Sequence, residues 1–332
     1  MKKKQRIRAC WAAFGLILLF QANARAYSSP LVPVGEAAGI ALETRGALIV
    51  GFSERSPAKD AGILEGDSIL SADGVPISGS ASLSGALADG KAEVRLCVLR
   101  GDETLEFTVT PDRSGETPRL GVFVRDALAG IGTVTYYDPE TGAFGALGHG
   151  VNAPGTQTLL SVTEGRLVFC TPDEIRPGAP GLPGELGGTF DADRVLGTIE
   201  SNTKSGIFGH SETGWTGDAL PVAAPDEIKP GEALVRSAVS GEVRDYTVFI
   251  RAIRPADASK RDMLIEVTDP DLLALTGGIV RGMSGSPILQ DGKLVGAVTH
   301  VLVGDPKKGY AIFMERMLAA AQDGAKTLSD AA

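Results

Sequence analysis

Glycine recurs along the whole chain, at 43 of its 332 positions, whereas proline occurs at an ordinary 19. Glycine weakens helices and permits the tight turns that join short strands. With 43% hydrophobic and 22% charged residues, the chain has the material for a folded core, which excludes collagen-like, coiled-coil and disordered chains. The composition therefore predicts a mostly β protein, and the length predicts two domains.

Residues 1–26 have the layout of a secretory signal. A basic stretch that ends at Arg8 precedes the apolar run Ala9 to Phe20, and two small-residue cleavage sites follow within residues 22–26. The apolar run is too short for a comfortable membrane-spanning helix. We predict export across the cytoplasmic membrane, with the signal either cleaved or kept as a loose anchor. A buried N-terminal helix is the alternative.

The charge of the chain argues against a nucleic-acid partner. The net charge is −9, and without the six basic residues of the signal region the chain has 26 basic and 41 acidic residues, a charge of −15. Such a body repels phosphate backbones. Outside the signal only Cys97 and Cys170 remain, which gives neither a disulfide framework nor a zinc spacing. We predict no metal and no cofactor.

The segment after the signal has a recognisable order of parts. Gly39–Leu42 and Ala47–Val50 have the pattern of paired strands, and the run from Ser56 to Gly74 reads S-P-A-x-x-A-G-I-L-x-G-D-x-I-L-x-x-D-G. This run resembles the PDZ domains of exported bacterial proteases. The predicted division is residues 27–112 for a spacer and a PDZ domain with its core at about 35–111, residues 113–119 for a linker, and residues 120–332 for a second domain.

The PDZ resemblance implies capture of a peptide by strand addition. A C-terminal or internal segment of a partner would pair beside a strand of the domain, and backbone N–H groups of the preceding loop would receive a carboxylate. Glu36 in that loop would repel a carboxylate, so internal segments stay open as ligands. The alternative is that this domain only packs against its neighbour. The predicted peptide-binding residues are Gly35, Gly39, Ile40, Ala41 and Leu42.

The second domain contains two glycine-flanked motifs that suit catalysis. His149 lies in G-A-L-G-H-G, and Ser284 lies in G-M-S-G-S-P, ahead of a D-G hairpin. A nucleophilic serine needs an exposed hydroxyl and backbone N–H groups that bind the oxyanion, and a G-x-S-G turn supplies both. We expect the N–H groups of Gly282 and Ser284 to form the oxyanion hole. Ser286 is the weaker candidate because it precedes Pro287.

The order of histidine before serine in a β-rich domain is that of chymotrypsin-like peptidases, which have two β-barrels. A string of the form Pro-Asp-Glu-Ile-basic-Pro-Gly occurs at residues 172–178 and again at 225–231. Two related β-modules would explain this repeat, and so would convergent turn chemistry. The fold prediction is therefore a mostly β chain with an N-terminal PDZ domain followed by a double β-barrel serine peptidase domain.

Over nearly its whole length the chain also resembles the stage IV sporulation protein B (SpoIVB) peptidases of spore-forming bacteria. The matching segments include G-A-L-G-H-G-V, G-I-F-G, T-D-P-x-L-L and G-M-S-G-S-P through A-V-T-H. The resemblance implies that His149 is the base, Ser284 the nucleophile and Asp269 the acidic partner. Spacing alone does not select Asp269. Five further aspartates between base and nucleophile stay open, namely Asp173, Asp193, Asp218, Asp245 and Asp262.

The family resemblance also implies a biological role. Such peptidases act in the space between forespore and mother-cell membranes, cleave the extracytoplasmic part of a membrane-embedded regulator of an intramembrane protease, and trim themselves near the N-terminus. Two alternatives remain. A catalytically silent scaffold would use its PDZ domain to dock membrane partners, and a cysteine peptidase would use Cys170, around which no activating turn is apparent.

Overall fold

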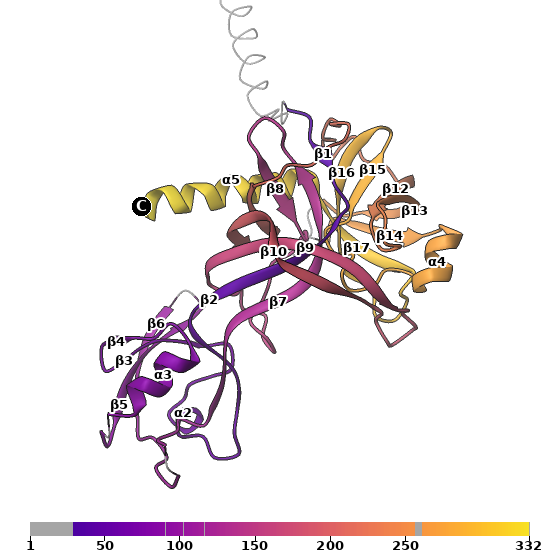
Figure 1. Cartoon of the computed structure of the whole chain (residues 1–332). Coiled ribbons are helices and arrows are strands. Elements are labelled where there is room, and N and C mark those ends of the chain that lie inside the picture. The colour runs from indigo at the N-terminus through magenta and orange to yellow at the C-terminus, as the bar shows by residue number, and fades with distance from the viewer. Residues whose placement is uncertain (1–28, 90, 102, 116, 256–260, 332) are drawn as a thin grey trace, which may run out of the picture.

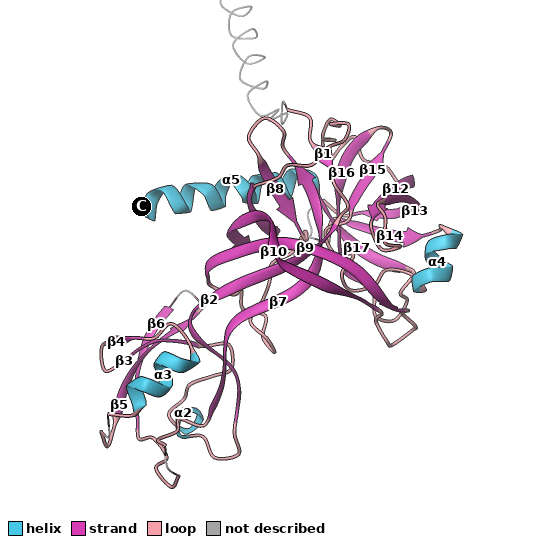
Figure 2. Cartoon of the chain, in the orientation of Figure 1, coloured by secondary structure: helices cyan, strands magenta, loops and turns pink. Residues whose placement is uncertain are grey.

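The computed structural model describes residues 29–331 apart from 90, 102, 116 and 256–260. The predicted signal, residues 1–26, lies outside the described residues. Strands dominate the chain, as Figures 1 and 2 show, and the prediction of a mostly β protein is confirmed. A small N-terminal lobe stands apart from a larger body. Among the helices of the described residues, none is both long and apolar enough to cross a lipid bilayer.

The small lobe packs two helices on a sheet, and short polar contacts fix its turns. Ser56 caps the first helix by accepting a hydrogen bond from the Lys59 N–H at 3.2 Å. The carboxylate of Asp67 is buried, accepts the Leu64 N–H at 2.8 Å and pairs with Arg100 at 2.7 Å. The elements are α2 (Pro57–Asp60), β3 (Ser68–Ala72), β4 (Val75–Pro76), α3 (Ser80–Leu87), β5 (Val94–Arg100) and β6 (Glu103–Val109).

Two long strands join this lobe to the body. β2 (Ala37–Phe52) and β7 (Val122–Tyr137) pair in antiparallel register from Phe52 opposite Val122 to Ala37 opposite Thr133. The first half of β2 also pairs with β9 of the body, and Ala47 and Leu48 pair with β3 of the lobe. The expected pairing of Gly39–Leu42 with Ala47–Val50 does not occur, because both segments belong to this one continuous strand.

The body contains two six-stranded barrels. In the first, β2 and β7 close a ring through four further strands in the order β2, β9, β10, β11, β8 and β7. The second is a closed barrel in the order β12, β13, β14, β17, β16 and β15. The further strands are β1 (Val32–Pro33), β8 (Ala143–Ala146), β9 (Val162–Arg176), β10 (Glu185–Thr203), β11 (Gly206–Ser211), β12 (Gly231–Ser237), β13 (Arg244–Ile253), β14 (Met263–Val267), β15 (Pro287–Gln290), β16 (Lys293–Val301) and β17 (Lys308–Phe313).

Each barrel has its own apolar core, and the C-terminal helix packs against both. Phe144 and Leu167 are buried inside the first barrel, and Val248 and Ile265 inside the second. Helix α5 (Met314–Ala331) contacts β10 and β11 of the first barrel and β16 and β17 of the second. Helix α4 (Pro270–Thr276) lies at the outer end of the second barrel (Figure 1). The prediction of a double barrel is confirmed.

Candidate active site

His149 stands on a strained turn directly after β8. Leu147 and Gly148 both have left-handed backbones, with φ of 71° and 69°. A Cβ atom at Gly148 would lie 3.1 Å from Cγ2 of Thr299, so glycine allows the turn to approach the second barrel closely. A non-glycine residue such as Leu147 in this conformation is uncommon and is stabilised here by burial. The turn carries His149 to the junction of the two barrels.

The ring of His149 is set up to act as a base. Its Nδ1 lies 2.9 Å from the carbonyl oxygen of Gly150, and a carbonyl can only accept, so we assign the proton to Nδ1. Nε2 is then the unprotonated nitrogen. Burial lowers the pKa of His149, and the hydrogen bond to Gly150 opposes this shift. The neutral, basic form of the ring therefore persists below the pH at which a free histidine would take up a proton.

Ser284 occupies a second tight turn, just before β15. Gly282 and Gly285 on either side have φ of 99° and 97°, a region that favours glycine. A Cβ atom at Gly285 would lie 2.0 Å from the carbonyl oxygen of Thr133, which excludes any side chain there. The Ser284 hydroxyl donates to the carbonyl oxygen of Thr299 at 2.8 Å. Its oxygen lines the same cavity as the His149 ring.

The backbone around Ser284 leaves two donors unused. The N–H groups of Gly282 and Ser284 donate to no group of the described residues. The Gly282 carbonyl accepts from Thr133 Oγ1 at 2.8 Å, and the Ser284 carbonyl accepts from the Thr133 N–H at 2.9 Å. Two free N–H groups, one on each side of Met283 and next to a hydroxyl, are what an oxyanion hole requires.

Thr133 of β7 holds the two turns together. Besides its two bonds to the serine turn, its carbonyl accepts the Leu147 N–H at 3.2 Å, two residues before His149. The Thr133 side chain is buried, and it lies 149 residues from Gly282 in the sequence. One residue of the first barrel therefore positions both the His149 turn and the Ser284 turn.

Ser286 is placed away from the cavity. Its side chain is fully buried, and its Oγ has no hydrogen-bond partner among the described residues. Its backbone is fixed in the turn, because the Ser286 N–H donates to the Met283 carbonyl and its own carbonyl accepts the Val298 N–H. A buried hydroxyl cannot reach a peptide, so the geometry favours Ser284 as the nucleophile.

The structure does not bring Asp269 to His149. Asp269 caps helix α4, where its carboxylate accepts hydrogen bonds from the N–H groups of Asp271, Leu272 and Thr247. Burial works against ionisation, but these hydrogen bonds lower the pKa of Asp269. The carboxylate is absent from the lining of the cavity. The role of acidic partner that the resemblance implied is thus not made in this arrangement, because the carboxylate is occupied by the helix cap.

The peptide-binding residues predicted for the PDZ domain also require correction. Ile40, Ala41 and Leu42 are paired on both sides, with Gly130–Leu128 of β7 and Leu167–Gly165 of β9, so they offer no free strand edge. The predicted loop belongs to the body as well. The Gly35 carbonyl accepts the Ala238 N–H, and Gly39 packs against Val168 and Phe190 of the first barrel.

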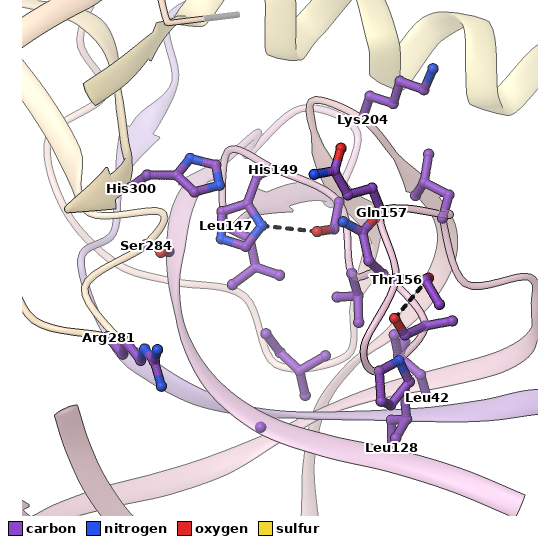
Figure 3. Close-up of a pocket in the computed structure, with 18 of the residues that line it drawn as sticks. Leu42, Leu128, Leu147, His149, Thr156, Gln157, Lys204, Arg281, Ser284 and His300 are labelled. Atoms are coloured by element: carbon purple, nitrogen blue, oxygen red, sulfur yellow. Dashed lines mark hydrogen bonds between the residues drawn. The ribbon is translucent and has the colours of Figure 1, made fainter. Parts of the chain in front are cut away.

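Residues around the catalytic pair complete a cavity of about 1090 Å³. Figure 3 shows Ser284, His149 and His300 close together, with Lys204 beyond His149 and Arg281 beyond Ser284. The rings of His149 and His300 lie 4.9 Å apart. Burial, and then repulsion from His149 and Arg261, lower the pKa of His300. Both rings are therefore neutral near pH 7.

Sequence reasoning missed several residues of this site. Thr133 reaches it only through the pairing of distant strands, and no local motif marks it. Thr299 and His300 end the matching segment A-V-T-H, but sequence reasoning assigned them no role in the site. His210, by contrast, pairs with Glu200 on the surface and lies outside the cavity. Burial raises the pKa of the Cys170 thiol to about 11, so it is not activated. No group of three His, Cys, Asp or Glu side chains among the described residues could hold a metal ion.

Comparison with known proteins gives matches for both parts of the chain. A family model described as SpoIVB peptidase S55 matches residues 116–318, and one described as PDZ domain matches residues 36–110. The serine protease HTRA1 of Xenopus tropicalis is 37% identical over 68 residues, which are 20% of this chain and 15% of that protein. The match thus spans a small part of that relative.

Two solved structures show a partial structural similarity to the chain. Rv3671c of M. tuberculosis H37Rv, as the inactive Ser343Ala mutant, gives a TM-score of 0.35 at 13% identity and covers 58% of this chain and 82% of its own. The HtrA-type protease AlgW with decapeptide gives 0.34 at 12% identity and covers 65% and 55%. These overlaps are too low to carry a statement about fold or function.

Proposed function

Since the chain belongs to the SpoIVB peptidase S55 family and is a serine peptidase with a PDZ domain, we propose that Ser284 is its nucleophile and His149 its general base. The observation that carries this proposal is the turn at Ser284. It joins a cavity-lining hydroxyl to two unused N–H groups, while Thr133 fixes the His149 turn to the same strand. No other described serine combines these features with a histidine in the same cavity.

The reaction follows from these positions. The Ser284 hydroxyl leaves the Thr299 carbonyl, gives its proton to Nε2 of His149 and attacks the carbonyl carbon of the substrate peptide. The carbonyl oxygen becomes an oxyanion held by the N–H groups of Gly282 and Ser284. The protonated His149 then donates to the leaving amine, and water attacks the acyl-enzyme with His149 again as the base. In this arrangement the Gly150 carbonyl, rather than Asp269, holds the His149 ring.

We further propose the biological setting of the reaction. The peptidase is exported, acts between the forespore and mother-cell membranes, cleaves the extracytoplasmic part of a membrane-embedded regulator of an intramembrane protease, and trims itself. The family membership and the signal-like residues 1–26 support this role. A PDZ domain beside a peptidase domain supports protein substrates.

We propose that the PDZ domain docks partner segments at an edge of β7, because the predicted edge at residues 40–42 is paired on both sides. Val122–Asp126 runs beside helix α3, where the N–H and the hydroxyl of Ser80 both bind the Asp126 carboxylate. On the edge away from β2, no described strand pairs with this stretch. Pairing of a partner segment here would still use strand addition.

Self-trimming and peptide cleavage by the full chain test the assignment. Ser284→Ala should keep the fold and abolish both activities, whereas Ser286→Ala should retain measurable cleavage. Loss of activity in Ser286→Ala with full activity in Ser284→Ala would overturn the nucleophile assignment. A chain that docks the regulator but cleaves nothing would support the scaffold alternative.

A further inference from the structure

The cavity beside Ser284 is lined by cations and by no described acid. Lys204, Arg261 and Arg281 border it, together with His149 and His300, and no Asp or Glu is among its described lining residues. This composition is unexpected, because acids outnumber bases in the chain by 41 to 32. A cleft lined by one sign of charge concentrates ligands of the opposite sign.

Arg281 is the cation closest in sequence to the nucleophile, three residues before Ser284, and its side chain is exposed. Two acids, Glu174 and Glu185, line an adjoining depression that Arg281 also borders. Both pair with Arg176, at 2.9 and 3.9 Å. No ion pair joins Arg281 to any described acid, so its charge is available to a ligand in the cleft.

The two other cations are likewise unpaired with acids among the described residues. Lys204 is exposed in the turn between β10 and β11. Arg261 lies over the ring of Tyr310, 4.7 Å from its centroid, a contact that leaves the positive charge in place. In Figure 3, Arg281 and Lys204 lie on opposite sides of the catalytic pair. Positive charge therefore flanks the position of a scissile bond.

The cleft also contains a free strand edge for an extended chain. The N–H and the carbonyl of Thr133 point away from β2, toward Ser284 and Leu147. Because backbone groups alternate along a strand, those of Ala129 and Ala127 lie on the same edge. Both alanines are exposed, no described strand pairs with that edge, and Ala129 lines the cavity. An extended segment can add there beside the catalytic pair.

We propose that this cleft selects extended substrate segments that carry Asp or Glu near the scissile bond, and that Arg281, Lys204 and Arg261 are specificity-determining residues. The inference rests on the peptidase function proposed above and names its substrate class. An acidic segment gains attraction from three cations, whereas a basic one meets repulsion and finds no described acid in the lining.

Digestion of a mixed peptide library by the full chain, with the cut sites read by mass spectrometry, tests this selection. Asp and Glu should be enriched within a few positions of the cut bonds. In a well-cut peptide, replacing the acids by Asn or Gln should lower kcat/KM about 10-fold. Raising the salt from about 0.05 to about 0.5 M should weaken cleavage of the acidic peptide and leave that of the amide peptide nearly unchanged.

Charge reversal separates specificity from general damage. Arg281→Glu should lower kcat/KM for the acidic peptide by about 10-fold or more and raise it for the same peptide with Lys in place of the acids. Arg166→Glu is the matched control, since Arg166 is exposed on β9, outside the cavity lining. It makes the same charge change and should leave both rates nearly unchanged. Equal loss for both peptides in Arg281→Glu, or a library without acidic enrichment, would overturn the proposal.

A binding measurement keeps the inference separate from the peptidase function. Ser284→Ala should bind a fluorescent Glu-rich decapeptide at least several-fold more tightly than its Gln counterpart, by anisotropy, whatever its activity. If the wild type cut nothing and Ser284 resisted a fluorophosphonate, the peptidase function would fail while this preference could still hold. Equal binding of the two decapeptides would contradict the acidic selection even in an active enzyme.

Discussion

The two barrels have the same number of strands but are built differently. In the second barrel the strands have 4 to 10 residues and lie around one buried core. In the first, β2, β7, β9 and β10 have 15 to 19 residues, extend beyond the barrel and expose apolar side chains such as Phe190. In the proposed mechanism the compact barrel supplies the nucleophile and the oxyanion donors. The extended one supplies the base, the free edge and the connection to the PDZ domain.

This difference indicates that the two barrels have different structural roles in the site. A short, closed barrel can hold the glycine-flanked Ser284 turn in place, because its strands all pack around one core. The long strands β2 and β7 instead connect the PDZ lobe directly to the free edge beside the cavity. Thr133 is one of the points at which the two barrels are joined, and it bonds to both the His149 turn and the Ser284 turn. The predictions below are designed to separate the contributions of the two barrels.

The largest effect is expected where the serine turn touches the first barrel. In Gly285→Ala the new Cβ atom would lie 2.0 Å from the Thr133 carbonyl oxygen, so we expect activity to fall more than about 100-fold. Gly292→Ala is the control, because Gly292 also has a positive φ but no atom within 4 Å of its Cβ position. It should only lose about 1–2 kcal/mol of stability. Similar activities in the two variants would contradict a close, fixed junction.

Thr133→Val should separate positioning from folding. The change keeps the shape of the side chain but removes the hydrogen bond to the Gly282 carbonyl, which fixes the peptide between the two proposed oxyanion donors. We expect kcat to fall about 10- to 100-fold with KM little changed. The control is Thr135→Val on the same strand, since the Thr135 hydroxyl is buried without a partner among the described residues. Thr135→Val should be fully active and no less stable than the wild type. Equal losses of kcat in Thr133→Val and Thr135→Val would refute the positioning role of the Thr133 hydroxyl.

The pH profile tests the environment of the base. Only neutral His149 can accept the Ser284 proton, so kcat/KM falls as the pH drops through its pKa. Because burial lowers that pKa, the acid limb should lie below the ordinary value of about 6.5. Rates measured from pH 4 to 8 would show this limb, and His210→Ala should leave it in place. A midpoint above about 7 would mean that a nearby acid stabilises the protonated ring.

The smallest effect is expected at Asp269. Asp269 caps α4. Asp269→Asn can still cap the helix and should keep activity within a few-fold of the wild type. Asp269→Ala loses the cap and should lower the free energy of unfolding by about 1 kcal/mol. Activity assays and chemical unfolding would measure both. A loss of about 10⁴-fold in a folded Asp269→Asn would show that this carboxylate orients the base after all.

The sequence predicted features that depend on neighbouring residues and missed those that depend on contacts between distant parts of the chain. The turns at His149 and Ser284 were predictable because local glycine positions encode their backbone shape. Thr133 was not, because its role arises from contacts 149 residues away. The pattern of Gly39–Leu42 and Ala47–Val50 predicted strands correctly, but it could not show that both belong to one strand whose first half is paired on both sides. Asp269 came from family resemblance alone, which fixes a position in the sequence and not a place in the fold.

The central claim is that His149 activates Ser284 across the barrel junction. The most direct test is the rate at which a fluorophosphonate labels the full chain, with the labelled residue identified by mass spectrometry. The account predicts a single adduct on Ser284 whose rate of formation falls with acid and drops at least about 100-fold in His149→Ala. An adduct on another serine, or labelling of Ser284 at an unchanged rate in His149→Ala, would contradict it.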